Sequence, residues 1–429
     1  MNAIGFLPLL LLLLTLVLLP LHSCSSSVTQ LFEAWCNKHG KTYTSDEEKQ
    51  RRLEIFEDNY AFVKKHNELG HSSYSLSLNA FADLTHHEFK ASHLSLVAAP
   101  TTSARRNVGD PGEVLRDIPT SKDWRKEGAV TDVKDQGQCG AYWAFAAVGA
   151  MEGINKIVTG TLFSLSAQEL IECDISHNNG CEGGFMDNAY QFVIDNHGIN
   201  TEDEYPYLER QRDCNKDFMK RRYVTIDGYT DVPANNETLL LQAVAAQPVS
   251  AGICASDRDF QFYHWGIFTG PCSKYLGHAV LIVGYGSKYG MDYWIVKNSW
   301  GHWGMGGYIF LQRNTGDSQG LCGINMLASY PIKTSPNPPP PPPPGPGICY
   351  LLNYCSEEEI CCCSWGFLGL CFVWTCCPYP AHPSNYLVWN TKTNMYLKHA
   401  GNEMTEAYKK RGSFGKFGGW NSFVEDQFL

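Results

Sequence analysis

The chain has 429 residues, of which 44% are hydrophobic, so it is long and apolar enough for two or three domains of ordinary size. Its formal net charge of -10 argues against nucleic-acid binding, which requires a basic face. Its 17 cysteines are typical of a secreted chain, because disulfides form and persist in an oxidising lumen.

The first residues predict a secretory signal peptide over residues 1–27. The run from Phe6 to Leu21 consists mostly of Leu, Val and Pro, and small polar residues follow it at 23–27. A membrane anchor is the alternative, but Pro8 and Pro20 interrupt the run, which falls short of the roughly 20 apolar residues that a comfortable span needs. No later stretch is apolar enough to cross a bilayer.

Residues 28–90 are charged and predicted to be helical. Six residues, spaced three and four apart, share one face of a predicted helix: Glu48, Arg52, Phe56, Asn59, Val63 and Asn67. An ordinary amphipathic helix explains this stripe, but not the segment Leu78-Asn79-Ala80-Phe81-Ala82-Asp83 that follows it. Residues 91–117 are rich in small and polar residues without apolar periodicity, which predicts an exposed linker where processing can occur.

The central part, residues 118–333, is predicted to be helical first and sheet second. Trp143 to Val158 is an Ala-rich helix that Gly160 ends, and Ser166 with Glu169 forms the capping-box pattern of another helix. Runs of β-branched and aromatic residues bounded by glycines predict strands at 280–283, 293–296 and 308–311.

A proline-rich linker is predicted at residues 334–348. The seven prolines at 338–344 lack the backbone donors of helix and sheet, and at about 3.1 Å per residue they make a stiff spacer of about 20 Å. Binding to an aromatic groove is the alternative role, but the position between two cysteine-rich blocks favours a spacer. Eight cysteines crowd into residues 349–377, and none occurs in the tail, residues 378–429.

Short motifs in the central part match the needs of a catalytic thiol. Such a thiol lies at a helix N-terminus beside a histidine, with one residue to hold the histidine and a donor for the oxyanion. The candidates are Gln136 in QGQCG, His278 in GHAV and Asn298 in KNSWG. Taken alone, each has an ordinary explanation as a surface amide, a core histidine or a turn residue.

Together these motifs and the N-terminal segment resemble the papain-like cysteine peptidases over roughly Leu31 to Cys377. His278 and Asn298 follow position 142 by 136 and 156 residues, close to the papain-type spacing of about 130 to 150. The resemblance implies an inhibitory propeptide at 28–90, with Phe32 and Trp35 as aromatic anchors, and a peptidase domain at 118–333.

The implied fold class is α+β, in two subdomains: a helical half and an antiparallel β-barrel half that enclose a cleft. The nearest resemblance is to plant members that carry a C-terminal granulin, of which residues 349–377 match the first part. A complete granulin needs further cysteine pairs, so residues 378–429 are an atypical tail, of the kind that a frameshift or a retained intron produces.

The resemblance assigns Gln136 to the oxyanion hole, His278 to the imidazole partner and Asn298 to its orienting amide, but the nucleophile position holds Tyr142. The family pattern Cys-Gly-Ser-Cys-Trp here runs Cys139-Gly140-Ala141-Tyr142-Trp143. Cys139 is no substitute, because it precedes the helix and the family pairs it in a disulfide. A phenol has an unperturbed pKa of about 10, and its ring fills space meant for the scissile carbonyl.

The resemblance also implies three disulfides and a set of residues that line the cleft. The implied disulfides are Cys139–Cys181, Cys173–Cys214 and Cys272–Cys322, which leaves Cys254 as a small buried hydrophobe. Gly183 and Gly184 match the strip that pairs with an extended peptide. Phe185, Met186 and Gly252 match family positions that line an apolar pocket for the second residue before the cleavage point. Taken alone, Phe185 and Met186 would be interpreted as ordinary core residues.

We therefore expect a catalytically inactive papain-family homologue that retains binding of peptides, pseudo-substrates or proteinaceous cysteine-peptidase inhibitors. The alternative is an active secreted or vacuolar endopeptidase whose Tyr142 is a sequence or gene-model error, since Cys and Tyr codons can differ by one base. A granulin that signals alone is disfavoured by its truncation. Cofactors, metals, nucleic acids and membranes are not expected as partners.

The chain is expected to be a monomer that carries its own propeptide through the secretory pathway to a vacuole, a lysosome or the cell exterior. Acid is expected to loosen the propeptide by protonating carboxylates such as Glu48 and Asp83, which have unperturbed pKa values of about 4. A chain with an inert Tyr142 is not expected to remove that propeptide itself.

Overall fold

The computed structural model describes residues 28–70, 72–94 and 118–339, and beyond these only short strands between residues 348 and 399. The chain divides into two compact units, residues 1–339 and 340–429. The predicted signal peptide, most of the processing linker and most of the proline run lie outside the described residues. No helix within the described ranges is long and apolar enough to cross a membrane.

The N-terminal segment forms helices, as the sequence predicts. A helix at residues 28–39 precedes α2 (Asp46–Glu68), and β1 (Tyr74–Leu76) and α3 (His86–His93) follow. The Ser45 side chain caps α2 by accepting from the Glu48 N–H, which has no partner inside the helix.

The predicted stripe on α2 is confirmed at its centre, where Phe56, Asn59 and Val63 are buried. The rings of Phe32 and Trp35 lie 5.2 and 5.3 Å from that of Phe56, so the two predicted anchors pack against the stripe.

Six helices follow in the central part, and the longest begins at Tyr142. They are α4 (Tyr142–Thr159), α5 (Ala167–Cys173), α6 (Met186–Asp195), α7 (Lys216–Met219), α8 (Glu237–Ala246) and α9 (Arg258–Gln261). Helix α4 ends at Gly160, whose φ of 78° is the left-handed conformation that glycine adopts freely at a helix end.

Only half of the predicted capping box of α5 is formed. The Ser166 hydroxyl accepts from the Glu169 N–H at 2.9 Å. The Glu169 carboxylate instead accepts from the Asn200 N–H and the Asn196 side chain, so it does not reach back to Ser166. The cap is therefore made by the serine, and the glutamate holds a neighbouring loop.

One nine-stranded sheet runs through the central part and takes in β1 of the N-terminal segment. Its strands after β1 are β2 (Lys122–Asp123), β3 (Gly228–Val232), β4 (Val249–Ile253), β5 (Tyr263–Phe268), β6 (His278–Lys288), β7 (Met291–Lys297), β8 (Tyr308–Gln312) and β9 (Ala328–Ile332). The order is β1-β5-β8-β7-β6-β4-β9-β3, with β2 beside β6. All pairs are antiparallel except β5 with β8, which departs from the antiparallel expectation.

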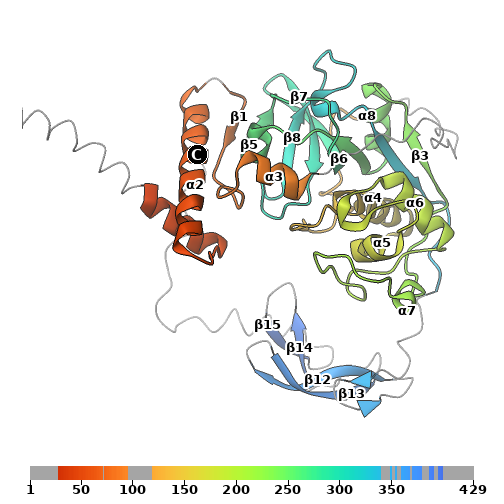
Figure 1. Cartoon of the computed structure of the whole chain (residues 1–429). Helices are drawn as coiled ribbons and strands as arrows, with labels where there is room; N and C mark the ends of the chain where they lie inside the picture. Colours follow the sequence, from red (N-terminus) through yellow and green to blue (C-terminus); the bar gives the residue numbers. More distant parts are fainter. Residues whose placement is uncertain are drawn as a thin grey trace, which may run out of the picture. The chain divides into compact units, whose positions relative to one another are not determined.

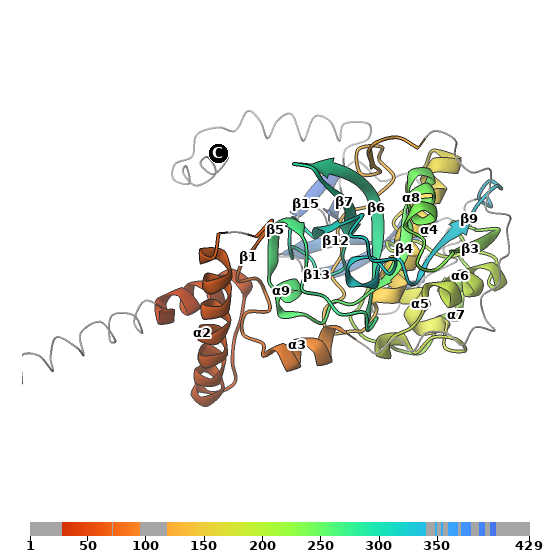
Figure 2. The same ribbon diagram turned by 90° about the horizontal axis from the view of Figure 1, so that it is seen from above.

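The two faces of this arrangement have separate cores. One buried apolar cluster joins α4, α5 and α6 to strands β6 and β7, and it includes Tyr142. The other joins the N-terminal segment to α8, α9 and the strands around β5. Figures 1 and 2 show α4, α5 and α6 on one side of the sheet and α2 with β1 at its opposite end.

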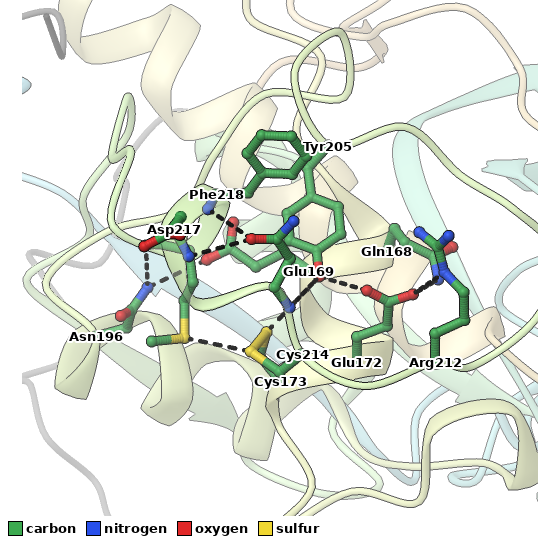
Figure 3. The surroundings of a disulfide bond; sticks show 12 residues. Gln168, Glu169, Glu172, Cys173, Asn196, Tyr205, Arg212, Cys214, Asp217 and Phe218 are labelled. Carbon is green, nitrogen blue, oxygen red and sulfur yellow. Dashed lines mark hydrogen bonds and ion pairs between the residues drawn. A yellow bond between two sulfur atoms is a disulfide. The ribbon is translucent and has the colours of Figure 1, made fainter. Parts of the chain in front are cut away.

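Three disulfides staple the central part, and they are the three pairs that the resemblance implies: Cys139–Cys181, Cys173–Cys214 and Cys272–Cys322. Beside Cys173, the buried Glu172 accepts from the Tyr205 hydroxyl and pairs with Arg212 at 3.2 Å (Figure 3). The disulfide therefore lies within a polar network that ties α5 to the loop carrying Arg212.

In the second unit the structure describes only backbone hairpins. Strand pairs are β10 (Ile348–Cys349) with β11 (Asn353–Tyr354), β12 (Glu359–Phe367) with β13 (Leu370–Pro378), and β14 (Tyr386–Asn390) with β15 (Met395–His399). The pairing of the eight cysteines at 349–377 lies outside the described side chains.

We predict that Asn59→Ala destabilises the precursor by about 1–3 kcal/mol or more, because it strips partners from buried polar groups. Asn59 is 1% exposed, and its amide donates to the Ala82 and Leu84 carbonyls at 2.9 and 3.0 Å. Urea unfolding of the purified precursor measures the change. Lys65→Ala, at an exposed position of the same helix, is the control and should shift stability by less than about 0.5 kcal/mol. Equal effects of both substitutions would contradict the prediction.

Candidate active site

The first residue of α4, Tyr142, is held in a fixed place. The Cys139–Cys181 disulfide and a 2.8 Å hydrogen bond from the Gly140 N–H to the Cys181 carbonyl anchor the loop before it. The ring is 1% exposed, and its centre lies 5.3 Å from that of His278. The position that the resemblance gives to a thiol is thus filled by a buried phenol beside the histidine.

His278 and Asn298 meet as the sequence predicts. His278 begins β6 and Asn298 follows β7, so the pairing of these two strands brings the side chains together. The Nε2 atom of His278 lies 2.7 Å from Oδ1 of Asn298, and the ring of Trp300 covers the imidazole at 4.7 Å. The Nδ1 atom of His278 is buried and makes no hydrogen bond within the described residues.

Burial lowers the pKa of His278 to about 4, although the Asn298 hydrogen bond opposes this shift. The side chain is fully buried, so water cannot stabilise an imidazolium there. His278 is therefore neutral from about pH 5 upward, and it lacks the thiolate that would favour a charged ring in a cysteine enzyme.

Gln136 lies beside this pair but is partly committed to other partners. Its Nε2 donates to the Cys139 carbonyl at 3.1 Å, and its Oε1 accepts from the Ser299 hydroxyl at 2.7 Å. Ser299 follows Asn298 directly, so Gln136 is linked to the histidine pair. The Gln136 side chain is 0% exposed.

Buried charges join α4 to β7, the strand that ends just before Asn298. Glu152 on α4 accepts from the Thr131 hydroxyl at 2.6 Å and pairs with Lys134 at 3.4 Å. Lys297 at the end of β7 donates to the Thr131 carbonyl at 2.8 Å, and burial lowers its pKa to about 8. This network fixes the helix that begins at Tyr142 relative to Asn298.

The predicted peptide-binding strip has a support that sequence reasoning missed. Asn178 accepts from the Phe185 N–H at 2.7 Å and donates to the Phe185 carbonyl at 3.2 Å. A side chain on Gly184 would place its Cβ 2.4 Å from Asn178 Oδ1, so only glycine fits against this amide. Asp174 holds Asn178 in turn at 2.6 Å. The only available sequence signal was the position of Asn178 just before Cys181.

The predicted pocket residues lie in apolar surroundings. Met186 is buried at the start of α6, and Phe185, which precedes that helix, is half-buried. A Cβ on Gly252 would meet Leu327 at 3.1 Å and Leu276 at 3.4 Å. These two leucines extend the predicted set, and Leu276 could have been found because it lies two residues before His278.

Cys254 is free and 0% exposed, so its predicted burial is confirmed. Its surroundings are more polar than expected of a small hydrophobe, because its Sγ lies 3.1 Å from the hydroxyls of both Ser256 and Ser273. Cys139, which the sequence argues against as a substitute nucleophile, is in a disulfide.

Two family models match the chain: papain family cysteine protease over residues 118–332, and the cathepsin propeptide inhibitor domain (I29) over residues 32–89. A probable cysteine protease, RD21C of Arabidopsis thaliana, is 47% identical over 353 residues, covering 82% of this chain and 78% of that protein. The chain belongs to the papain family of cysteine proteases.

Solved structures of papain-family precursors share the fold. Recombinant stem bromelain precursor is 38% identical with a TM-score of 0.67, covering 72% of this chain and 100% of that chain. The proform of Amb a 11, a ragweed pollen allergen, is 40% identical with a TM-score of 0.67, covering 72% of this chain and 96% of that chain. The α+β fold and the propeptide are thereby confirmed.

The propeptide packs beside the site through the end of α3. The imidazole of His93 is buried against Trp300, with ring centres 6.2 Å apart, and stacks on Phe89 at 5.3 Å. The Trp300 ring therefore contacts both His93 of the propeptide and His278 of the candidate site. Burial also lowers the pKa of His93 to about 4.

The carboxylates expected to release the propeptide in acid are not at its interface. Glu48 pairs with Arg51 and Arg52, and Asp83 with Lys41, all inside the propeptide. The stripe on α2 showed which residues share a face but not what that face packs against. Two ion pairs do join the propeptide to the rest of the chain. Asp58 pairs with Arg258 at 2.5 Å, and His66 pairs with Asp259 at 3.2 Å.

We predict that the precursor loses stability as the pH falls from 6.5 to about 4, and that His93 contributes to the loss. Its pKa is lowered by burial from 6.5 to about 4, so within this window the unfolded chain binds the proton and the folded chain does not. Thermal unfolding at pH 7 and pH 4.5 measures the difference. It should be smaller for His93→Gln than for the wild type.

The control is His87→Gln, which removes an exposed imidazole from the same helix and should leave the pH dependence unchanged. If both variants show the same pH dependence as the wild type, His93 is not a source of acid sensitivity.

Proposed function

We propose that this chain is a catalytically inactive papain-family homologue whose cleft binds peptides or proteinaceous cysteine-peptidase inhibitors without cutting them. The observation that carries the proposal is the Tyr142 ring, which is buried at the start of α4 beside His278. The residues of the proposed oxyanion hole and imidazole pair, Gln136, His278 and Asn298, are close to it but have no thiol to act on.

Proton transfer argues against a catalytic phenol. An unperturbed phenol has a pKa of about 10, and burial lowers that of His278 to about 4. Moving the proton from such a phenol to His278 is therefore uphill by about 8 kcal/mol, before attack on an amide has begun. A thiol, with an unperturbed pKa of about 8.5, begins about 1.5 pKa units closer to that of His278, which is about 2 kcal/mol. The helix N-terminus lowers the pKa of a thiol further.

The rest of the cleft supports a binding role. Asn178 shapes the strip at Gly183 and Gly184, which we propose pairs with the backbone of an extended peptide. Met186 and Gly252 lie among apolar side chains. This favours peptides whose side chain is apolar at the second residue before the cleavage point of the family. The chain acts as a monomer in the secretory pathway, in a vacuole, a lysosome or outside the cell.

The second candidate is an active cysteine endopeptidase in which position 142 is naturally a cysteine. It is favoured by the 2.7 Å contact between His278 and Asn298, which a protein without catalysis has no need to keep. Sequencing codon 142 in both genomic DNA and transcript distinguishes the two candidates. The partial granulin at 349–377 has no role in either.

We predict that the purified precursor shows no amidase activity and stays intact at acidic pH, whereas Tyr142→Cys gains both peptide hydrolysis and self-processing near residues 91–117. The gain is expected because the substitution supplies a thiol at a helix N-terminus beside His278. Hydrolysis of a fluorogenic peptide and a gel time course measure the two outcomes. Adding an active relative should trim the wild-type precursor at the same linker.

Tyr142→Ala is the matched control, because it opens the same space without a nucleophile and should remain inactive. Self-processing by the wild type would overturn the proposal and favour the active enzyme. A folded but silent Tyr142→Cys would show that the defect extends beyond this residue.

A further inference from the structure

We propose that Asn236 carries one N-linked glycan, attached in the secretory lumen. The triplet Asn236-Glu237-Thr238 is the one Asn-x-Ser/Thr triplet without a central proline in the 429 residues. The proposal rests on the predicted signal peptide and on the disulfides, which belong to an oxidising compartment, and not on whether the cleft is active.

The folded structure leaves the reacting nitrogen available. Asn236 caps α8, and it does so through Oδ1, which accepts from the Leu239 N–H at 3.0 Å. Its Nδ2 makes no hydrogen bond within the described part of the chain. A sugar on Nδ2 keeps the amide carbonyl, so a glycan and the helix cap can coexist.

The turn around Asn236 is fixed by other groups. The Asn235 N–H donates to the Asn325 carbonyl at 2.7 Å, and the Glu237 carboxylate accepts from the Asn314 N–H at 2.9 Å. Residues 233–235 and Thr238 are exposed, so a large substituent meets solvent on both sides of the acceptor.

The position is also compatible with the propeptide. The triplet follows β3, which ends the strand order at the edge opposite to β1, the strand that the propeptide adds. Figures 1 and 2 show α8 and β3 on the side of the sheet away from α2 and β1. A glycan at Asn236 therefore stays clear of the propeptide and remains on the body after trimming.

The chemistry is a transfer from a lipid-linked oligosaccharyl diphosphate, the donor class of the luminal transferase. The bond between the sugar C1 and the diphosphate oxygen breaks, and a bond from C1 to Nδ2 of Asn236 forms. Nδ2 gives up one proton, and the lipid diphosphate leaves. No redox partner is needed.

The test is mass spectrometry of the full-length chain secreted from a eukaryotic host. Treatment with peptide-N-glycosidase should lower its mass by one glycan and leave a carboxylate at position 236 in the peptide map. Thr238→Ala should abolish the glycan while keeping the Asn236 cap, and Thr238→Ser, which preserves the acceptor triplet, should retain it. Trimming by an active relative should leave the glycan on the fragment that begins near residue 118.

Secreted wild-type protein with an unmodified Asn236, or with its glycan at another residue, would overturn the proposal. The wild-type peptide map decides this alone, so the result stands even if a variant is poorly secreted. Neither outcome depends on Tyr142, and failure here leaves the proposed loss of catalysis unaffected.

Discussion

The fixed start of α4 is the constraint on which the site depends. The Cys139–Cys181 disulfide holds the preceding loop, and the Glu152 network ties the helix to the strand before Asn298. Neither anchor involves the side chain at position 142. The start of α4 is therefore held beside His278 by contacts that do not depend on which side chain stands at position 142.

The same constraint explains why a tyrosine is accepted there. Tyr142 belongs to the buried apolar cluster of α4, β6 and β7, where its ring gains from being removed from water. The ring faces a neutral His278, whose burial disfavours any charged partner. A large uncharged side chain thus suits the folded core, and it places a phenol rather than a thiol beside His278.

Much of the fold and part of the site could be predicted from the sequence, because they rest on local patterns. The α2 stripe, the glycine end of α4 and the β-branched strands follow from periodicity and end residues. The pairing of His278 with Asn298 followed from two motifs whose strands are neighbours.

What could not be predicted depends on contacts between separate elements. Glu169 matches the capping pattern, but a loop some thirty residues away takes its carboxylate. Glu48 and Asp83 are acidic and lie in the propeptide, yet only the packed structure shows that their partners are internal. The Asn178 support and the His93 contact likewise arise from packing, which no single motif encodes.

The most direct test of the central claim is the intact mass of the trimmed, folded protein after treatment with a thiol-directed covalent inhibitor of papain-family enzymes. Tyr142 offers no thiolate and Cys254 is buried, so a peptide map of the labelled protein should show no mass added within residues 118–333 under native conditions. Labelling of Cys254 after denaturation confirms that the reagent is active. A stoichiometric adduct on the folded protein, within the peptide that contains position 142, would contradict the account.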